Sequence, residues 1–510
     1  MIARPAGLAD GSARWPALPA AFGAGVLAAA GQAPLGLWPL ALVGFATLFA
    51  LVMPVSRPWR AARVMWLGGG GYFAAALAWI VQPFLVDAAR DGWMAPFALV
   101  FMAFGLALFW GCAAWGAAWL GATARMRALA LIVTLGLAEL LRGYVLTGFP
   151  WASIGHLWIG TPVMQAAALG GPSLLTFLAL VAAILPVAFG LRGALVALAV
   201  AGAAWGIGAW RLSQPVPRRA DAPVVRLVQP NAAQHLKWQR DMIPVFLNRQ
   251  LRLTSARSEP APDLIVWPET AVPYALDNAG PVLAEIAQAA GGRPVVLGIQ
   301  RWQDGRPLNS AVALDAAGRV SAIYDKHHLV PFGEYMPLAD LFARVGVFGL
   351  AALENRGYAA GPGPRLMDLG PLGNVLPLIC YEAIFPQDLR GTATRPDWIL
   401  QITNDAWFGT FQGPYQHLAQ ARLRAVEQGL PLLRAANTGV SAVIGPKGRL
   451  LHMLPLNRAG MLNAPLPPGL AVTPYARMGD LPMALVLGLA LALLGAGRSR
   501  NGVDRGGRTP

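Results

Sequence analysis

Three residues in separate parts of the chain have side chains that could together carry out an acyl transfer. The apolar run Leu-Ile-Val-Trp-Pro leads into Glu269, and the apolar run Leu-Pro-Leu-Ile leads into Cys380. Lys326 is one of only three lysines among 40 basic residues, which indicates a need for a compact ammonium rather than a guanidinium. A carboxylate can remove the proton of a thiol, the thiolate can attack a carbonyl carbon, and an ammonium can hold the resulting oxyanion.

Each of these residues also has a simpler interpretation when it is taken alone. Glu269 fits a loop carboxylate, Lys326 fits an ion pair with the nearby Glu334, and Cys380 fits a buried structural thiol. Cys112 lies inside a long apolar run and is interpreted as a small apolar filler. Cys380 is the only cysteine outside such a run, and a free thiol there favours a nucleophile.

The pair His327 and His328 raises the question of a bound metal. Zinc sites draw three or four ligands from characteristic spacings, and no third ligand accompanies this pair at such a spacing. We therefore expect neither a metal nor a cofactor. The net charge of +15 does not indicate a nucleic-acid partner, because many arginines lie in short gaps between apolar runs instead of forming a patch.

The part of the chain that contains these residues has the pattern of an α/β domain. Turn signals separate short runs rich in β-branched residues, and helices are expected at 281–290 and 415–429. Strands are expected at Val224–Val228, Leu264–Val266, Val295–Ile299, Ala311–Leu314, Val320–Tyr324, Val375–Ile379, Ile399–Thr403 and Ser441–Ile444. Glu269, Lys326 and Cys380 each end or follow one of these strands. Strand ends of one sheet converge on one rim, so the three side chains could meet there.

The rest of the chain has the composition of a membrane protein. Hydrophobic residues make up 56% and charged residues 13% of the chain, against roughly 45–50% and about 25% in ordinary soluble domains. Eight apolar runs have about the length of roughly 20 residues that a membrane span needs. These runs lie at about 17–34, 36–55, 62–86, 94–120, 127–146, 163–190, 193–211 and 482–497.

The distribution of arginine predicts the orientation of these spans. Arginines gather before the first span, in alternate loops and in the C-terminal tail, whereas the opposite short loops hold little beyond Arg90. The positive-inside rule then places both termini in the cytoplasm and the α/β domain on the other face. The predicted organisation is a seven-helix region over 1–211, the α/β domain over 212–475, a last span over 482–497 and a cytoplasmic tail over 498–510.

Three features inside the membrane part have structural interpretations. Glu139 and Arg142 share one helix face and are expected to form an ion pair. Trp151 is expected to face lipid as an interfacial anchor. The glycine run Gly68–Gly71 is expected to allow close helix packing, or a kink, rather than phosphate binding.

The motifs around the three chemical residues resemble those of the nitrilase superfamily. They are Val-Trp-Pro-Glu at Glu269, Asp-Lys-x-x-Leu-Val-Pro-Phe-Gly-Glu at Lys326 and Ile-Cys-Tyr-Glu at Cys380. With seven predicted spans before this domain and one after it, nearly the whole chain is similar to the apolipoprotein N-acyltransferase family. The segments Gly148–Trp151, Gln229–Asn231, Leu236–Trp238 and Asn404–Gly409 fit the same family.

This resemblance implies both a fold and a mechanism. The fold would be a membrane α-helical bundle of about eight helices joined to an αββα nitrilase-like sandwich. Cys380 would take an acyl chain from a phospholipid as a thioester, Glu269 would be general base and then general acid, and Lys326 would stabilise the tetrahedral intermediates. Supporting roles would fall to Glu334, Tyr381, Glu382 and Trp238, of which the last three otherwise fit packing aromatics and a solvated carboxylate.

The resemblance also implies the partners and the location. The acceptor would be the α-amino group of the diacylglyceryl-cysteine at the N-terminus of a lipoprotein. The enzyme would be a monomer in the bacterial inner membrane, with its catalytic domain in the periplasm. Both substrates carry acyl chains, and extracting them from a bilayer costs roughly 0.8 kcal/mol per CH₂, so a catalytic domain carried by a membrane bundle avoids that cost.

Two other functions are compatible with these residues. A membrane-anchored amidase would use the same three residues and let water resolve the thioester, although one anchoring helix would suffice. A transporter with a ligand-binding outer domain is less compatible, because only Glu139 and Arg142 are buried charges and no repeat is visible. Apolar loops at the mouth of the site would favour acyl transfer. The candidate lids are Trp407–Phe411 and Leu341–Leu353, which includes Phe342, Val345, Val347 and Phe348, unless these loops pack on the domain's own core.

Overall fold

The computed structural model describes residues 17–217, 221–339, 341, 344 and 357–506, which form two compact units. The helical unit consists of the described residues within Met1–Ala78, Pro96–Ser213 and Asp480–Pro510. The α/β unit consists of those within Trp79–Ala95 and Gln214–Gly479, so it also takes in the end of the third predicted span and the loop after it.

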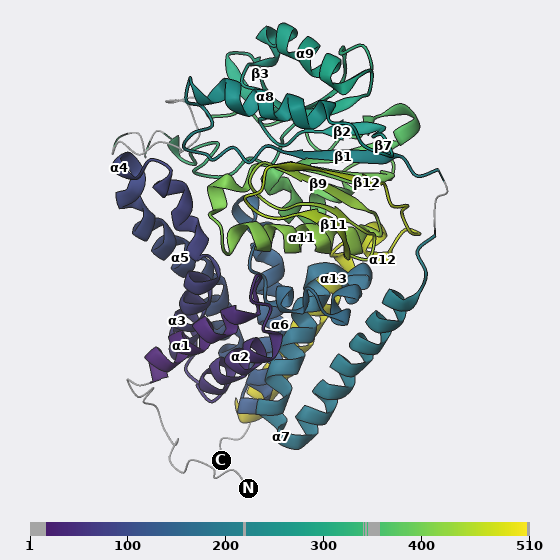
Figure 1. The fold of residues 1–510 in the computed structure, drawn as a ribbon. Helices are drawn as coiled ribbons and strands as arrows, with labels where there is room; N and C mark the ends of the chain where they lie inside the picture. Colours follow the sequence, from purple (N-terminus) through teal and green to yellow (C-terminus); the bar gives the residue numbers. More distant parts are fainter. Residues whose placement is uncertain (1–16, 218–220, 340, 342–343, 345–356, 507–510) are drawn as a thin grey trace. The chain divides into compact units, whose positions relative to one another are not determined.

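The chain forms helix in every segment where the sequence predicts a span (Figure 1). The α-helices are α1 (Ala17–Ala28), α2 (Trp38–Val52), α3 (Pro58–Ala76), α5 (Ala95–Leu120), α6 (Ala124–Arg142), α7 (Ala167–Ser213) and α13 (Leu481–Gly506). Short helices between them are η1 (Ala29–Gly31), η2 (Ala78–Leu85), α4 (Ala88–Asp91), η3 (Gly92–Met94), η4 (Val145–Thr147), η5 (Ile154–Trp158) and η6 (Pro162–Ala166).

Fewer helices meet the requirements of a membrane span than the eight predicted. Among the described residues, three helical stretches are long and apolar enough, namely Ala88–Leu120, Pro162–Ser213 and Leu481–Arg498. A fourth results if α3 and η2, bent by 49° against each other, count as one span. The shortfall has two causes. Helices α1 and α2 have only 12 and 15 residues, and α6 carries three arginines and a glutamate in 19 residues.

Helix α7 is a hairpin of two antiparallel arms rather than one 47-residue rod. Its backbone leaves the helical conformation at Gly190, where φ is +60° and ψ is −137°. A Cβ at Gly193 would lie 1.9 Å from the carbonyl oxygen of Leu185, and a Cβ at Gly208 would lie 1.9 Å from that of Pro162. Pro162 lies in η6, before a further break at Gly170 and Gly171, so the second arm also packs against the segment that precedes the first arm. The single stretch therefore contains both the sixth and the seventh predicted segments.

The packing inside the helical unit agrees with two expectations and corrects a third. A Cβ at Gly71 would lie 2.2 Å from the carbonyl oxygen of Phe22 on α1, so the glycine run permits close helix packing. Arg142 Nη2 pairs with Glu139 Oε2 at 3.0 Å, and both side chains are buried. The expectation for Trp151 was wrong. Its side chain is 1% exposed, because the chain folds inward where Arg142 Nη1 donates to the backbone carbonyl of Trp151 at 2.8 Å.

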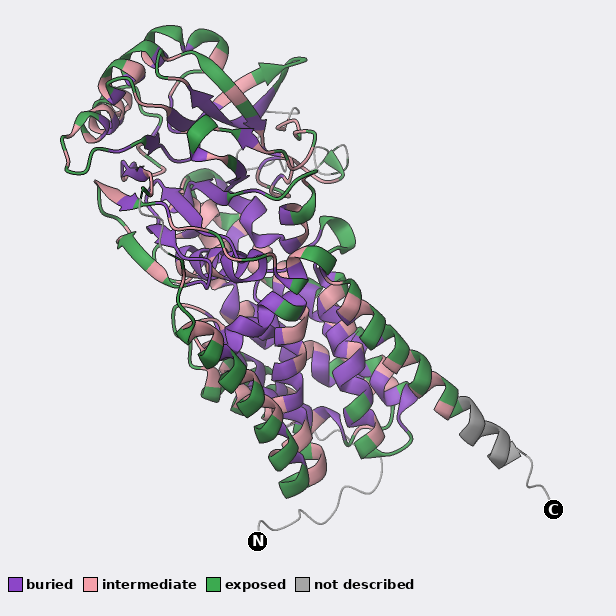
Figure 2. Ribbon diagram, turned by 90° about the vertical axis from the view of Figure 1, so that its right-hand side faces the viewer, coloured by how far each residue is buried: buried purple, intermediate pink, exposed green. Residues whose placement is uncertain are grey.

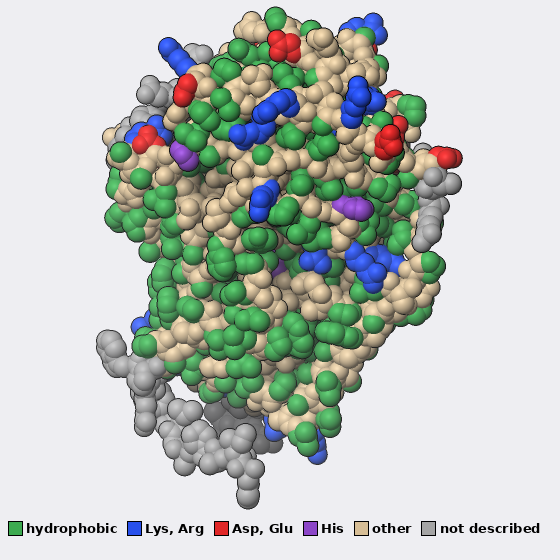
Figure 3. Space-filling view, in the orientation of Figure 1, with side chains coloured by type: hydrophobic (Ala, Val, Ile, Leu, Met, Phe, Trp, Pro, Cys, Tyr) green, Lys and Arg blue, Asp and Glu red, His purple; other side chains and the backbone are tan. Residues whose placement is uncertain are grey.

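The outside of the helical unit is apolar. Large apolar side chains are exposed along α13 and along the second arm of α7, and the α13 segment is largely exposed in Figure 2. The face of this unit seen in Figure 3 carries mainly hydrophobic side chains and few charged ones. The exposed side chains on these two helices include Leu191, Leu195, Leu198, Trp210, Leu485, Leu489 and Leu493. A contiguous apolar surface of this kind marks a contact with lipid or protein.

The α/β unit contains two six-stranded sheets (Figure 1). The first has the order β12 (Gly460–Pro465), β1 (Val224–Gln229), β2 (Leu264–Val266), β3 (Val295–Gln303), β4 (Arg306–Leu314), β5 (Val320–Asp325). The second has the order β11 (Leu450–Leu454), β10 (Ser441–Ile444), β9 (Leu432–Ala436), β8 (Trp398–Thr403), β7 (Asn374–Ile379), β6 (Met367–Asp368). Strands β1 to β3 are parallel, and β5 runs in the same direction because β4 is antiparallel to both β3 and β5. In the second sheet β7, β8 and β9 are parallel.

The two sheets pack on each other between two helical layers. Strand β1 contacts β9 and β10, and β4 contacts β7. Helices α8 (Met242–Ser255) and α9 (Gly280–Ala290) cover the first sheet, where Trp267, Ile286 and Leu297 belong to one apolar core. Helix α11 (Gly413–Gln428) covers the second sheet, where Leu378 and Leu418 belong to another. The remaining helices are η7 (Leu276–Asn278), η8 (Gly370–Leu372), η9 (Cys380–Ile384), η10 (Pro386–Arg390), η11 (Asp405–Phe408) and α12 (Pro474–Met478). The unit is thus the αββα sandwich that the resemblance implied.

Candidate active site

The structure brings Glu269, Lys326 and Cys380 together at strand ends. Strands β5 and β7 end immediately before Lys326 and Cys380, and β2 ends shortly before Glu269. Lys326 Nζ lies 3.6 Å from Glu269 Oε1, and both charges act on the Cys380 thiol. Two of the residues therefore come from the first sheet and one from the second, so the site depends on the packing of the two sheets.

The carboxylate of Glu269 is buried and held by two donors. Asn309 Nδ2 donates to Oε1 at 2.7 Å, and the backbone N–H of Asn404 donates to Oε2 at 2.8 Å. The residue is only 6% exposed. A carboxylate fixed in this way beside a thiol has the position that a general base requires.

Lys326 lies between two carboxylates. Its Nζ donates to Glu334 Oε1 at 2.7 Å, and Glu334 is fixed in turn because its Oε2 accepts from the backbone N–H of Val330 at 2.8 Å. Burial alone would lower the pKa of Lys326, but the negative charges of Glu334, Glu269 and a Cys380 thiolate raise it above its usual value. The ammonium therefore keeps its charge at neutral pH and can stabilise an oxyanion.

Cys380 occupies a strained backbone position. Its φ is +52°, in the left-handed region that non-glycine residues rarely adopt, and the side chain is 5% exposed. Burial, and then the charge of Glu269, raise the pKa of the Cys380 thiol, while Lys326 acts in the opposite direction. The thiol is therefore protonated at rest, and a base would have to remove its proton for the sulfur to act as a nucleophile.

Glu382 joins the ends of strands β5 and β7. It is fully buried, and its Oε2 accepts from the backbone N–H of Ile379 at 2.7 Å and from the Tyr324 hydroxyl at 3.0 Å. Its Oε1 accepts from the backbone N–H groups of His327 and His328 at 2.8 and 3.3 Å. One carboxylate thus ties the residue before the thiol to the residues after the lysine, so the reading of Glu382 as a solvated carboxylate is excluded.

Tyr381 is buried beside the same segment. Its side chain is 4% exposed, and its ring packs edge-on against Phe385 and His328, with centroids 4.9 and 5.8 Å apart. The Tyr381 ring therefore packs as a buried aromatic side chain. Its backbone N–H is the first one after Cys380 in the chain.

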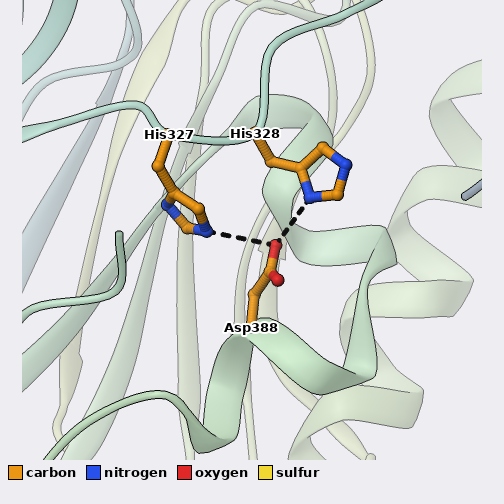
Figure 4. A group of neighbouring side chains, drawn as sticks. All are labelled: His327, His328 and Asp388. Carbon is orange, nitrogen blue, oxygen red and sulfur yellow. Dashed lines mark hydrogen bonds and ion pairs between the residues drawn. The ribbon is translucent and has the colours of Figure 1, made fainter. Parts of the chain in front are cut away.

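His327 and His328 lie beside a carboxylate that the sequence pattern does not pair with them. Asp388 Oδ2 is 3.3 Å from His327 Nε2 and 3.0 Å from His328 Nδ1, as Figure 4 shows. These three side chains are close enough to hold a metal ion. Burial alone would lower the pKa of His327, but its bonds to Asp388 and Glu382 raise it to about 10. With a proton on each nitrogen, this ring lies within reach of both carboxylates, at 2.7 Å from Glu382 Oε1 and 3.3 Å from Asp388 Oδ2.

Trp238 is not part of the group formed by Glu269, Lys326 and Cys380, but its neighbour Lys237 connects it to Glu269. Trp238 is 44% exposed, and the ammonium of Lys237 lies 5.0 Å from the centre of its ring. Lys237 Nζ donates to the backbone carbonyl of Glu269 at 3.4 Å. Both residues line a small pocket together with Phe246 and Pro268. Burial lowers the pKa of Lys237 to about 8.

Asn309 and Asn404 are site residues that the sequence pattern does not single out for a role. Asn309 points from β4 toward Glu269, and Asn404 follows the last residue of β8. The signal available for Asn404 was its position, because it follows a strand directly, as Lys326 and Cys380 do. No comparable signal marks Asn309, since polar residues within strands are common.

Of the two predicted lid loops, the structure describes one almost not at all and the other completely. Of Leu341–Leu353, only residues 341 and 344 are among the described residues, so Phe342, Val345, Val347 and Phe348 lie outside them. In the second loop, Phe411 is 58% exposed, whereas Phe408 is 9% exposed and packs edge-on against the ring of Trp79 at 5.0 Å. This loop therefore has one buried anchor and one exposed apolar tip.

Comparisons with known proteins extend over both units. Residues 224–473 match the family described as carbon-nitrogen hydrolase, and residues 24–185 match the apolipoprotein N-acyltransferase N-terminal domain. The chain is 36% identical over 501 residues to the apolipoprotein N-acyltransferase of Rhodopseudomonas palustris, covering 92% of this chain and 93% of that protein. It is 38% identical over 494 residues to the enzyme of that name from Brucella suis, with the same coverage of 92% and 93%.

Among solved structures, an amidase from Nesterenkonia sp. matches 53% of this chain and 98% of its own, with 22% sequence identity and a TM-score of 0.37. The sequence relatives are the stronger finding, because their similarity exceeds one third identity and runs through the helical and the α/β unit alike. The chain therefore belongs to the apolipoprotein N-acyltransferase family.

Proposed function

We propose that this chain transfers an acyl chain from a phospholipid to the α-amino group of the diacylglyceryl-cysteine at the N-terminus of a lipoprotein. A thioester on Cys380 is the intermediate. The observation that supports this most is the position of Glu269 and Lys326, whose opposite charges lie 3.6 Å apart and both act on the buried Cys380 thiol.

In the first half-reaction, Glu269 takes the thiol proton of Cys380 as the sulfur attacks the ester carbonyl of the phospholipid. Lys326 and the backbone N–H of Tyr381 stabilise the oxyanion of the tetrahedral intermediate. The intermediate then breaks its carbon–oxygen bond, and the leaving lysophospholipid alkoxide takes the proton back from Glu269. The products are the acylated thiol and a lysophospholipid.

In the second half-reaction, the α-amino group attacks the thioester carbonyl and Glu269 takes a proton from the amine. The carbon–sulfur bond then breaks, and Glu269 returns the proton to the sulfur. The raised pKa of the Cys380 thiol makes its thiolate a strong nucleophile but a poor leaving group. The Lys326 ammonium offsets this in the second step, because it stabilises the departing thiolate.

Three further residues have supporting roles in this proposal. Glu334 holds the Lys326 ammonium in place through the bond of 2.7 Å. Glu382 fixes the backbone on both sides of the site. Trp238, which is 44% exposed beside the pocket next to Glu269, contacts the incoming acyl chain.

We further propose that the helical unit crosses the bacterial inner membrane eight times, with the α/β unit in the periplasm and both termini in the cytoplasm. The hairpin of α7 supplies two of these crossings, and the exposed leucines of α13 and α7 supply a lipid-facing surface. The chain acts as a monomer. A fluorescent reporter that matures only in the cytoplasm should be active when fused after residue 510 and inactive when inserted in the loop at Asp304.

The test of the chemistry is an intact-mass measurement on detergent-purified protein mixed with phospholipid. The wild type should gain one acyl group, which a diacylglyceryl-cysteine peptide removes. Cys380→Ala should gain nothing, whereas Cys112→Ala, the matched control at the only other cysteine, should behave as wild type. Active protein without acylation of Cys380 would rule out this mechanism.

A membrane-bound amidase is the second candidate, because the carbon-nitrogen hydrolase match spans the same α/β unit. In that case water would discharge the acylated Cys380 at the same rate with and without the acceptor peptide.

A further inference from the structure

His417 lies fully buried on the far side of the nucleophile's backbone. It projects from α11, and its Nε2 is 2.9 Å from the carbonyl oxygen of Cys380. Gln401 Nε2, from β8, donates to the same carbonyl at 3.2 Å. Cys380 itself has a φ of +52°, so these two side chains bond to the carbonyl of a strained residue.

Two charged residues hold the other side of the His417 ring. Asp405 Oδ1 lies 3.0 Å from His417 Nδ1, and Arg434 Nη2 lies 3.3 Å from the same nitrogen. Arg434 also pairs with Asp405 Oδ2, and Thr403 Oγ1 donates to Asp405 Oδ1 at 2.9 Å. Asp405, His417 and Arg434 are all completely buried, so the ring has a single orientation.

Both neutral forms of this ring connect it to the carbonyl of Cys380. With the proton on Nε2, His417 donates directly to that oxygen, and Nδ1 accepts from Arg434. With the proton on Nδ1, His417 donates to Asp405 and accepts from Gln401 Nε2 at 2.9 Å, whose amide donates to the carbonyl. Either way the histidine fixes the backbone that carries the thiol.

We infer that His417, held by Asp405 and Arg434, is a positioning residue that keeps Cys380 in its left-handed conformation and its thiol in line with Glu269 and Lys326. It touches neither substrate nor the reacting atoms. This inference rests on the proposed role of Cys380 as the nucleophile. Displacing a reacting group by about 1 Å can cost roughly a hundredfold in rate, so loss of His417 should act on the reaction step rather than on lipid binding.

The test compares three variants of α11 in detergent with phosphatidylethanolamine as acyl donor. His417→Ala should lower the single-turnover rate of Cys380 acylation by about a hundredfold at saturating lipid, with the half-saturating lipid concentration unchanged. His417→Gln, whose amide can donate and accept at the same place, should recover part of the rate. Gln420→Ala is the matched control, because Gln420 is about as buried one turn along α11 and its amide donates to the carbonyl of Gln416 rather than to that of Cys380.

A second readout separates positioning from general damage. Alkylation of Cys380 by iodoacetamide should have a different pH profile in His417→Ala, because the displaced thiol lies at changed distances from Glu269, which raises its pKa, and from Lys326, which lowers it. The profile of Gln420→Ala should match that of the wild type. A His417→Ala protein with wild-type acylation and alkylation would overturn the inference, as would an equal loss in Gln420→Ala. If His417→Ala does not fold, His417→Gln decides, because a purely structural role predicts no change in its pH profile.

The two readouts also separate this inference from the proposed function. Wild-type protein that is never acylated by phospholipid would contradict the proposed function. The alkylation profile would still test whether His417 positions the thiol.

Discussion

Replacing Glu382 with glutamine should destabilise the α/β unit strongly and stop acylation. Besides the His327 ring, the carboxylate accepts from four donors, and Gln keeps only one acceptor oxygen. Its NH₂ group must therefore face either Ile379 N–H with Tyr324 O–H or the backbone N–H groups of the two histidines. Two buried donors then lose their partner. Each such loss costs about 1–3 kcal/mol, so we expect about 2–6 kcal/mol in all.

The assay is the thermal unfolding midpoint of the detergent-purified variant, followed by acylation of Cys380 below that temperature. A domain of this size loses roughly 2–4 °C per kcal/mol, which gives a fall of about 4–24 °C. Tyr324→Phe is the control, because it removes one neutral donor from the same carboxylate and should cost only about 1 kcal/mol. A Glu382→Gln protein that melts within a degree or two of the wild type would refute the reasoning, since the donors would then have other partners.

Three further predictions concern the charges of the site. Lys326→Met should lower the rate of Cys380 acylation by about a hundredfold or more, because it removes the oxyanion's cation; single-turnover kinetics would measure this, and a rate like that of the wild type would contradict it. The folded-state pKa of His327 is about 10, above its usual value of about 6.5. The folded state therefore holds the extra proton, and the stability it gives should be complete below about pH 6.5 and lost as the pH rises to about 10. Unfolding midpoints of wild type and His327→Gln across that range should converge at the alkaline end, and parallel curves would count against the ion pair. Dialysis against a chelator should leave acylation unchanged, because a proton on His327 already satisfies Asp388; lost activity that zinc restores would reveal a metal at this cluster.

The positions of the three chemical residues could be predicted because strands with β-branched residues lead directly into them. The runs before Cys380 and Glu269 are rich in Ile, Val and Leu, which is typical of strands buried on both faces. The strands β9 and β12 have no such signal. Their sequences, Leu-Leu-Arg-Ala-Ala and Gly-Met-Leu-Asn-Ala-Pro, lack β-branched residues, and only pairing with neighbouring strands makes them extended.

The partners of these residues were less predictable, for a physical reason. Asn309 and Asp388 lie within contact of Glu269 and His327 only after strands and turns far apart in the sequence have packed. A pattern read along one segment contains no information on such pairs. For the same reason Trp151 was misjudged, because its burial follows from the inward fold of the chain around Arg142.

The pairing of β1 with β12 has a consequence for the order in which the protein matures. The antiparallel register sets Val224 opposite Pro465. The sheet that begins with β1 is therefore complete only when β12, the last strand of the domain, has paired with it. Contacts this distant in sequence are slow to form, because the long intervening chain loses much conformational freedom when they close. Glu269 and Lys326 belong to the sheet that closes last. The thiol of a newly made chain should therefore stay unreactive until almost the entire domain has been synthesised and folded. The ability of Cys380 to become acylated should then arise in one late step rather than gradually.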